Sequence, residues 1–320
     1  MAAQLAGLTD PNLIAARSTA LLLHSPVNFL RELPPEAQQA RYGTGAAAVF
    51  GLKPGEEVLS MTTGAEGQWL LQHLPWDTEF FGAATYRLFT GLFAADAHPS
   101  AIAQAAMELR ATLAKRGPYY AFSVVPAEDV TLLQALSSGG WRLIETRLNF
   151  YRSTAEPISM PHFPVRMARP EEAAHIGLVS AGARNVFDRF HAHPWFGEAR
   201  ADRMLTRYAE AAVEGTYADA VLVPNEAHLP IDSFLAIGDT LAETGVTGSG
   251  YSRVLLTAVG PQNRGWHLKL VAETVRRAAY LSLPYVLMTT QATNRAVFRT
   301  CEKLNFRLGS TTHVLACFSE

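Results

Sequence analysis

Residues 255–270 read LLTAVGPQNRGWHLKL, and this stretch decides the fold. A continuous apolar run ends in the turn Gly260-Pro261, and a loop containing Gly265 then opens an amphipathic helix at Trp266. The first N–H groups of a helix have no partner inside the helix, and the helix dipole favours negative charge beyond them. The order of strand, loop and helix therefore predicts an anion site, for which a pyrophosphate is a natural occupant.

Gly265 lacks a β-carbon, so ligand phosphates can approach the backbone closely there. The helix that follows carries an apolar face at steps of three and four residues, made by Leu268, Val271, Val275 and Ala278. Taken by itself, the pattern is also that of an ordinary turn between a strand and a helix. A dinucleotide-binding fold is a poor alternative, because no G-x-G-x-x-G follows any expected strand.

The loop QNRGWH, residues 262–267, resembles the signature Q/R-x-x-G-x-G/A of the GNAT acyltransferases. It matches at Gln262 and Gly265 and departs at His267, whose ring must turn away from the pyrophosphate or contact it. The resemblance implies acetyl-CoA as co-substrate, with its pyrophosphate on main-chain amides and its pantetheine arm paired with the preceding strand. The residues so implicated are Ala258, Val259, Gln262, Asn263, Arg264, Gly265, Trp266, His267 and Leu268. It also implies that strands 254–259 and 285–290 lie side by side and diverge at their C-terminal ends, with the Trp266 helix beginning beside the gap.

A second match lies downstream, where TQATN at 290–294 and EKLNF at 302–306 resemble the family pattern TQ-x-x-N followed by Y-E-x-x-G-F. The spacing from Asn294 to Phe306 agrees with that pattern, and Asn294 is implied to face the coenzyme. Asn305 replaces a glycine, and asparagine tolerates the left-handed conformation that such a helix end often needs.

Cys301 stands where the family commonly has a tyrosine that protonates the departing thiolate. A thiol, with a pKa of about 8.5, is a poorer proton donor to another thiolate than a phenol with a pKa of about 10. Cys301 shares a helix face with Val297 and Leu304, so we expect it to fill space, with a catalytic role as the alternative. Cys301→Ala is then expected to retain most turnover.

Two further stretches resemble dTDP-fucosamine acetyltransferases and their relatives, which acetylate an amino group on a nucleotide-linked deoxysugar. LPWDTEFFG at 74–82 resembles W-D-[ST]-x-F-F-G, and DRFHAHP at 188–194 resembles S-R-F-H-x-D-P. The second stretch implies substrate contacts by Asp188 and by Arg189, whose guanidinium can clamp a phosphate. The aromatic residues of the first can equally form a packed cluster. Asp188 and His193 both depart from the pattern, so the acceptor can differ from a dTDP-sugar.

An amine must lose its proton before it attacks a thioester. His191 and His193 are the candidate bases, since histidine alone titrates near neutral pH without perturbation. For Arg189 and His191 the alternative is a solvated group at a helix end.

The expected fold class is α/β with a mixed sheet, a GNAT fold in the C-terminal half and a degenerate GNAT-like domain before it. We expect an unassigned N-terminal extension at 1–73, of which about the first 60 residues are helical, the degenerate domain at 74–152, a Ser- and Pro-rich linker at 153–164 and the acetyltransferase domain at 165–320. The motifs GWRL at 140–143 and NFRL at 305–308 hint at a repeat between the halves.

The expected strands are 86–92, 120–125, 142–151, 220–223, 233–238, 253–259, 285–290 and a terminal strand pair. The expected helices are 101–116, 130–137, 170–181, 199–214, 266–280 and 295–304.

Composition narrows the class of partner. With 48% hydrophobic residues, 18% charged residues and a net charge of -2, the chain can build cores but lacks a sequence-wide basic field. Two cysteines suggest neither a disulfide framework nor a metal site, and no signal peptide or membrane span is evident. We expect a cytoplasmic protein whose partners are acetyl-CoA and a small amine, without nucleic acid, membrane or metal; a homodimer is left open.

Three functions compete at this point. The first is an N-acetyltransferase that moves the acetyl group of acetyl-CoA to a primary amine, such as that of an amino sugar. The second is a GNAT-fold module that binds acyl-CoA with little or no catalysis, and the third is a structural protein without a ligand. Thermal stabilisation by coenzyme separates the third from the others, and thioester turnover separates the first from the second.

Overall fold

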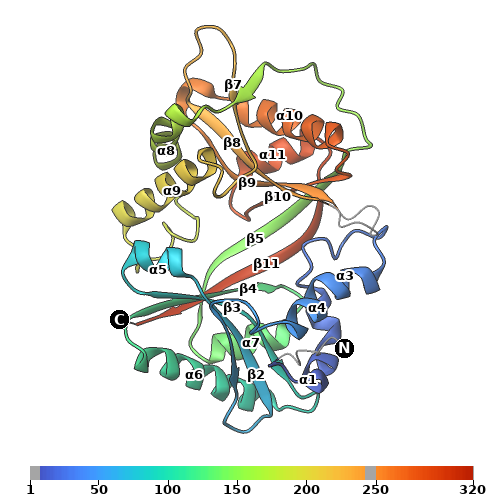
Figure 1. The fold of residues 1–320 in the computed structure, drawn as a ribbon, viewed down its shortest axis with the longest axis vertical. Helices are drawn as coiled ribbons and strands as arrows, with labels where there is room; N and C mark the ends of the chain where they lie inside the picture. The colour runs from blue at the N-terminus through green and yellow to red at the C-terminus, as the bar shows by residue number, and fades with distance from the viewer. Residues whose placement is uncertain (1–7, 242–249, 320) are drawn as a thin grey trace, which may run out of the picture. The chain divides into compact units, whose positions relative to one another are not determined.

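The computed structural model describes residues 8–241 and 250–319, which form two compact units (Figure 1). Unit 1 comprises the described residues up to Thr146 and those from Ser310 onward, and unit 2 is Arg147–Gly309. In chain order, the first elements are α1 (Pro11–Ala16), α2 (Ser18–Leu22), α3 (Pro35–Arg41), α4 (Gly43–Ala48), β1 (Glu56–Ser60), β2 (Gly67–His73), α5 (Pro75–Phe81), β3 (Ala84–Phe93), α6 (Pro99–Lys115), β4 (Tyr119–Pro126), α7 (Val130–Ser138) and β5 (Arg142–Ser153). They are followed by β6 (Val165–Met167), α8 (Ala173–Gly182), α9 (Glu198–Val213), β7 (Ala220–Pro224), β8 (Ser233–Thr240), β9 (Tyr251–Val259), α10 (Trp266–Tyr280), β10 (Tyr285–Gln291), α11 (Arg295–Lys303) and β11 (Arg307–Phe318).

The strands lie in the order β1-β2-β3-β4-β11 in unit 1 and β6-β7-β8-β9-β10-β5 in unit 2. In each unit one pair is parallel, β3 with β4 and β9 with β10, and the other neighbours are antiparallel. The strand that follows α7 pairs with β10 in unit 2, whereas the strand that follows α11 pairs with β4 in unit 1. Each unit therefore takes its last strand from the other half of the chain.

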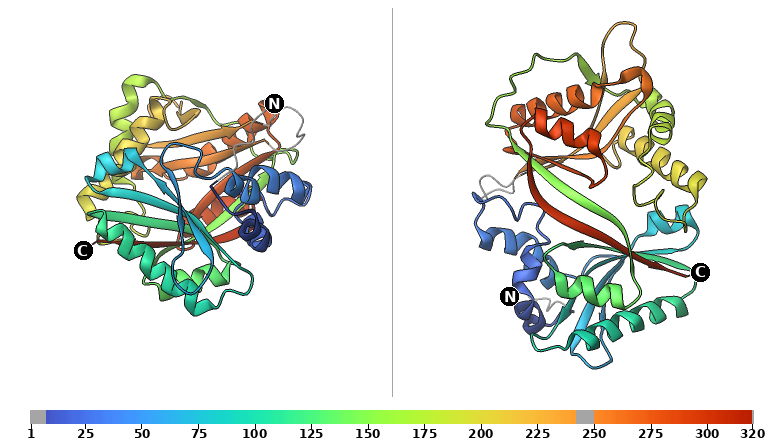
Figure 2. Two further views of the ribbon diagram at one scale, coloured as in Figure 1. Left: turned by 60° about the horizontal axis from the view of Figure 1, so that its bottom comes forward. Right: turned by 180° about the vertical axis from the view of Figure 1, so that it is seen from behind.

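The unit 2 sheet is buried on both faces. Alternate residues of a strand point to opposite faces, and each set packs in a different hydrophobic cluster. Leu222 and Leu235 face α10 and α11, whereas Val221 and Phe234 face α8 and α9. Figure 2 shows α10 and α11, in orange and red, side by side. Burial on both faces explains why these strands read as continuous apolar runs in the sequence.

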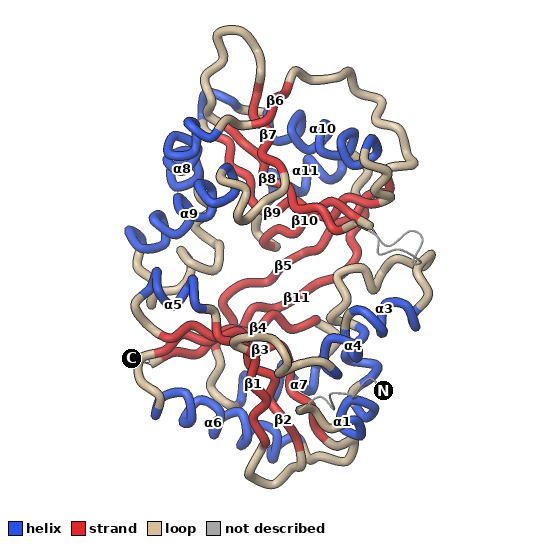
Figure 3. Tube along the Cα trace, in the orientation of Figure 1, coloured by secondary structure: helices blue, strands red, loops and turns tan. Residues whose placement is uncertain are grey.

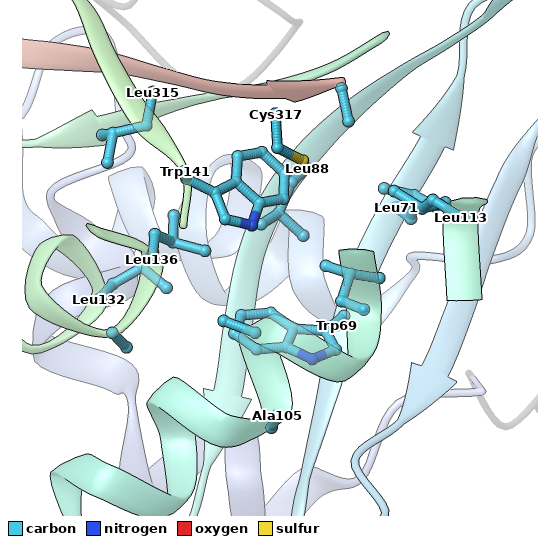
Figure 4. Packing of buried hydrophobic residues seen from close by; sticks show 14 of the residues in the cluster. Trp69, Leu71, Leu88, Ala105, Leu113, Leu132, Leu136, Trp141, Leu315 and Cys317 are labelled. Atoms are coloured by element: carbon cyan, nitrogen blue, oxygen red, sulfur yellow. The ribbon is translucent and has the colours of Figure 1, made fainter. Parts of the chain in front are cut away.

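The unit 1 sheet is covered in the same way. Trp69 and Leu71 pack with α6, α7 and Trp141 on one face, within the cluster drawn in Figure 4. Leu70 and Leu92 pack on the other face with apolar residues of α1, α2 and α4. The predicted N-terminal extension contains the helices α1 to α4, as expected, and they supply part of the unit 1 core, but its last part forms the strands β1 and β2.

The helix ends after α7 and α11 repeat one geometry, as the two short motifs suggest. Gly140 and Asn305 both take the left-handed conformation, with φ of +84° and +54°. The next residues, Trp141 and Phe306, each donate an amide hydrogen bond of 2.9 Å to the carbonyl five residues earlier. The left-handed conformation predicted for Asn305 is confirmed.

The expected strands and helices from residue 86 onward are confirmed, with boundaries that move by at most three residues. The expected terminal strand pair is wrong, since 307–318 form the single strand β11. Gly309, the one glycine there, does not adopt a positive φ, so the chain does not turn back. The short strands β1, β2 and β6 and the helix α5 were not predicted. No described helix has the length and apolar content that a membrane span requires.

Of the expected linker, 153–164, the first residue ends β5 and 154–164 form a loop before β6 (Figure 3), all within unit 2. Arg152 holds one end by donating to the carbonyls of Glu156 at 2.9 Å and Pro157 at 3.2 Å. The amide of Phe163 holds the other end by donating to Glu273 Oε1 at 2.7 Å. The chain passes between the compact units inside β5 and β11 instead, and the four-part domain division stays a prediction.

Candidate coenzyme site in unit 2

The parallel strands β9 and β10 pair over only four residues, from Tyr251 opposite Tyr285 to Val254 opposite Met288. Beyond that point neither strand pairs with the other, although β9 continues to pair with β8 on its far side as far as Val259. The prediction that these strands lie side by side and diverge is confirmed. Residues 255–259 thus keep a main-chain edge without a strand partner, and this edge includes the predicted pantetheine contacts Ala258 and Val259.

A β-bulge marks the divergence. Ala236 of β8 pairs with Leu256 and Ile237 with Val254, so Leu255 has no opposite residue. A bulge bends its strand and increases the local twist, which turns the end of β9 away from β10 while β9 stays paired with β8. The break in pairing with β10 and the bulge therefore fall at the same residue step.

The first half of the loop after β9 is held by the protein itself. The amide of Gly260 donates to the carbonyl of Asp232 at 2.6 Å, and the amide of Gln262 donates to the Asp232 carboxylate at 2.8 Å. Asn263 is buried, with its amide on the Gly260 carbonyl and its side-chain Nδ2 on Pro230 O at 3.1 Å and Ser233 Oγ at 2.9 Å. The amides of Gln262 and Asn263, predicted to bind pyrophosphate, thus have protein acceptors.

The open amides begin one residue later. Those of Arg264, Gly265, Trp266, His267 and Leu268 have no hydrogen-bond acceptor within residues 8–241 and 250–319. Gly265 is the N-cap of α10 with a φ of +88°, and a β-carbon built on it meets no atom within 4 Å. Glycine is needed here for its backbone conformation, and open space adjoins the helix N-terminus. Five successive donors and the helix dipole make an anion site.

Three side chains of the loop have different surroundings. Trp266 is buried in the core with the ammonium of Lys269 4.2 Å from its ring centre, so only its main chain can serve a ligand. Leu268 packs half-buried against the same core. The Arg264 side chain is exposed and forms no ion pair with the described residues, so its charge is available beside the open amides.

The ring of His267 turns toward α11, with Nδ1 2.9 Å from Thr300 Oγ1. Its Nε2 is buried and has no partner among the described residues, and burial lowers the pKa of the ring to about 4. The ring is therefore neutral at pH 7. The side chain that replaces the family's Gly or Ala packs against the neighbouring helix α11. This contact also places the first turn of α10 beside α11.

Asn294 is the N-cap of α11, and its Oδ1 accepts the amide of Val297 at 3.3 Å. The end of β10 is fastened separately, because Gln291 Oε1 accepts from Asn185 Nδ2 at 2.8 Å in the segment between α8 and α9. Asn185 was not predicted, and no sequence signal links positions 106 residues apart.

Cys301 lies in the apolar core of unit 2 between the sheet and α10 and α11, with 1% of its surface exposed. Burial raises the pKa of its thiol to about 12, so the group is neutral at physiological pH. Cys301 corresponds to Leu136 in the repeated helix end. The carbonyl of Cys301 accepts the amide of Phe306, and the carbonyl of Leu136 accepts the amide of Trp141 in the same way. The position thus corresponds to an aliphatic core residue in unit 1.

The predicted acceptor residues Asp188 and His191 are brought together, but they bind each other. His191 Nδ1 lies 2.8 Å from Asp188 Oδ2, and Nε2 lies 3.0 Å from Asp202 Oδ1. With 4% of its side chain exposed, His191 has both ring nitrogens turned toward carboxylate oxygens, so neither faces an open site. Asp188 Oδ1 also accepts the amides of Phe190 and His191, which fixes the turn.

The other two residues of that segment are packed as well. His193 is 2% exposed, and its Nδ1 accepts the amide of Trp195 at 3.1 Å. The Arg189 guanidinium lies 4.5 Å from the ring centre of Phe190. The other predicted acceptor stretch, residues 74–82, includes α5 of unit 1, where Trp76 stacks on Phe80.

Comparison with known proteins gives similarity at the level of structure. No family model matches the sequence, and no curated protein matches it significantly. A GCN5-related N-acetyltransferase from Sphaerobacter thermophilus is 12% identical, with 96% of this chain and 94% of that chain covered and a TM-score of 0.55. The chain has a GNAT fold.

Two further structures resemble this GNAT fold. A functionally unknown conserved protein from Staphylococcus epidermidis is 12% identical, with 81% of this chain and 94% of that chain covered and a TM-score of 0.52. A tandem GNAT protein from the clavulanic acid biosynthesis pathway is 13% identical, with coverages of 98% and 96% and a TM-score of 0.49.

Proposed function

We propose that this protein transfers an acetyl group from acetyl-CoA to the primary amine of a small molecule. The observation that carries the proposal is the row of open amides from Arg264 to Leu268 beside strands that diverge. The pyrophosphate binds these amides, where the helix dipole and the exposed Arg264 guanidinium favour negative charge. Asp232 confines it to this part of the loop, since its carboxylate already holds the amide of Gln262.

The pantetheine arm binds the open main-chain edge of β9 at Ala258 and Val259, in the manner of an added strand. This geometry directs the thioester toward the gap between β9 and β10. The amine nitrogen attacks the thioester carbonyl carbon, the carbon–sulfur bond breaks, and one proton passes from the amine to the departing thiolate or to solvent. Holding both reactants in this arrangement supplies much of the acceleration.

Proton transfer falls to water in this proposal. Both nitrogens of His191 face carboxylates, the Nδ1 of His193 accepts a main-chain amide, and the Cys301 thiol is buried. An ordered water chain is an ordinary route for such protons. Catalysis then rests on positioning rather than on a side-chain acid.

For the acceptor we propose a small amine, with an amino sugar or sugar nucleotide as the first class to assay. That choice rests on the resemblance of residues 188–194, and Arg189 is the side chain proposed to meet a phosphate of the acceptor. The alternative, a module that binds acyl-CoA without turning it over, differs in a measurable way.

The test pairs calorimetry with coenzyme A and a thiol-release assay with acetyl-CoA and a panel of amines. Gly265→Glu is expected to weaken coenzyme binding at least ~100-fold, since juxtaposed like charges cost several kcal/mol. Gly197→Glu is the matched control, because Gly197 is also a helix N-cap with a positive φ and open space at its β-carbon. Equal affinity for the two variants would remove the site, and binding without turnover would favour the binding module.

A further inference from the structure

Unit 1 contains the same break in strand pairing as unit 2. Its parallel strands β3 and β4 pair from Ala84 opposite Tyr119 to Leu88 opposite Ser123 and no further. A bulge falls at Phe89, because Leu70 of β2 pairs with Thr90 and Leu71 with Leu88. The next helices, α6 and α7, follow β3 and β4 as α10 and α11 follow β9 and β10.

The helix N-terminus beside this divergence is closed. α6 begins with Pro99, which has no amide hydrogen, and His98 Nδ1 accepts the amide of Ser100 at 3.3 Å. The same Nδ1 lies 2.7 Å from Ser100 Oγ. Two of the donors that α10 keeps open are therefore missing or occupied in α6.

The divergence itself is occupied by Arg17, the residue between α1 and α2. Its Nε donates to the Gly91 carbonyl at 3.2 Å, on β3 beyond the last paired residue. Its two terminal nitrogens donate to the Asp129 carboxylate at 3.2 Å and 2.5 Å, and Asp129 is the N-cap of α7, which follows β4. The side chain thus reaches from the main chain of one diverging strand to the helix that follows the other.

Arg17 is enclosed on its remaining sides. Only 8% of its surface is exposed, and its guanidinium lies 4.2 Å from the ring centre of Phe93. The bulged Phe89 is covered by Phe50, at 5.8 Å between ring centres, and by His24, at 5.1 Å. Both rings come from the chain before residue 51, so the N-terminal segment surrounds the bulge.

We propose that Arg17, carried by the N-terminal helices, is the permanent occupant of the unit 1 divergence and takes the main-chain acceptor and N-cap that a coenzyme would otherwise approach. Unit 1 then binds no coenzyme, and the chain binds one equivalent, in unit 2. The stoichiometric part rests on the proposed function, whereas the occupancy of unit 1 does not.

The first test measures exchange of the amides at 89–93 by hydrogen–deuterium exchange in full-length Arg17→Met. We expect exchange there to be roughly tenfold faster or more, because local opening loses its principal restraint. Arg116→Met is the matched control, since Arg116 also pairs bidentately with a carboxylate in unit 1 but at the surface. Equal exchange in the two variants at 89–93 would overturn the occupancy. If Arg17→Met does not fold, Arg17→Lys retains the charge without the fork and is read in the same way.

The second test counts coenzyme A by calorimetry. We expect one equivalent on the natural chain and none on Gly265→Glu. One equivalent remaining on Gly265→Glu, together with two on the natural chain, would overturn the inference for unit 1. No binding to the natural chain would instead refute the proposed function and leave the exchange result to decide the occupancy of unit 1.

Discussion

Unit 2 and unit 1 each contain two parallel strands that part after a bulge, at Leu255 in one and Phe89 in the other. In unit 2 the adjoining helix presents a run of open amides behind a left-handed glycine. In unit 1 the adjoining helix begins with proline and a histidine cap, and a buried arginine lies across the divergence. The divergence therefore belongs to the fold, and the residues around it decide whether a ligand can enter.

The N-caps of α7 and α11 show the difference most directly. Asp129 and Asn294 each precede the repeated aromatic residue by the same number of positions, and each caps its helix. The carboxylate of Asp129 also neutralises Arg17, whereas the amide of Asn294 carries no charge and cannot form an ion pair. A change of one residue type accompanies the change from an open to an occupied divergence.

The largest expected effect comes from Asp129→Ala. It leaves the buried Arg17 charge unpaired and should lower the free energy of unfolding by about 3–5 kcal/mol. Asn294→Ala removes only a cap and should lower it by about 1 kcal/mol. Urea denaturation followed by circular dichroism measures both.

A double variant separates charge from capping in that comparison. Asp129→Asn keeps a capping oxygen, and combined with Arg17→Met it removes both charges together. We expect the double variant to be more stable than Asp129→Ala, because no unpaired charge stays buried. Similar losses for Asp129→Ala and Asn294→Ala would show that the two caps are equivalent after all.

His24 in unit 1 and His267 in unit 2 behave alike, because desolvation within the fold lowers the pKa of both rings to about 4. In the unfolded chain the value is near 6.5. Above pH 6.5 neither state binds the proton, so stability is complete. Between pH 6.5 and 4 the unfolded state binds it and the folded state does not, so stability falls as the pH falls.

Over this pH range each histidine lowers the free energy of unfolding by about 3 kcal/mol. Most of this loss occurs at pH values above those at which most carboxylates titrate. Unfolding at pH 7.5 and pH 5 measures about 2 kcal/mol of this loss for each histidine. His267→Ala and His24→Leu should each flatten the dependence by about half of the histidine contribution. An unchanged slope in either variant would mean that its ring is protonated without opening the fold.

The loop and helix of unit 2 could be predicted because their signals are local. Gly260-Pro261 ends a strand, Gly265 permits a left-handed N-cap, and the helix period then runs without interruption to Tyr280. The strands β1 and β2 were missed because the Ala-rich residues before them suggested only helix. Residues 307–318 were predicted as a strand pair, whereas they form one strand of 12 residues, which is longer than a usual strand.

The contact that occupies the unit 1 divergence and the contact that holds the unit 2 loop could not be predicted, because in both the two partners are distant in sequence. Arg17 is 112 residues from Asp129, and Asp232 is 30 residues from the Gln262 amide that it binds. An isolated arginine or aspartate carries no periodicity that would reveal a partner. The placement of Asn263 and His267 was also hidden, since sequence assigns a side chain to a loop without saying which way it turns.

Cys301→Ala has a smaller expected effect on stability. Removing a buried sulfur from the unit 2 core should cost about 1–2 kcal/mol, and turnover should stay within a factor of a few if the residue only packs. Cys317→Ala is the matched control, because Cys317 is equally buried in unit 1 and burial likewise raises its pKa to about 12. A loss on the order of 100-fold in Cys301→Ala alone, with coenzyme affinity intact, would place that thiol in the mechanism.

The smallest expected effect concerns the repeated helix ends, where Asn305 and Gly140 share the left-handed conformation. Asn305→Gly should change the free energy of unfolding by less than about 1 kcal/mol, because glycine relieves the strain of a positive φ but gives the unfolded chain more freedom. Gly140→Asn should be worse, since a β-carbon there would meet the Arg110 guanidinium at 2.0 Å, and that group donates to the Gly139 carbonyl. Thermal unfolding of the two variants gives the comparison. Equal shifts would mean that the repeated geometry tolerates either residue in both units, and that the glycine of unit 1 is not required by its arginine neighbour.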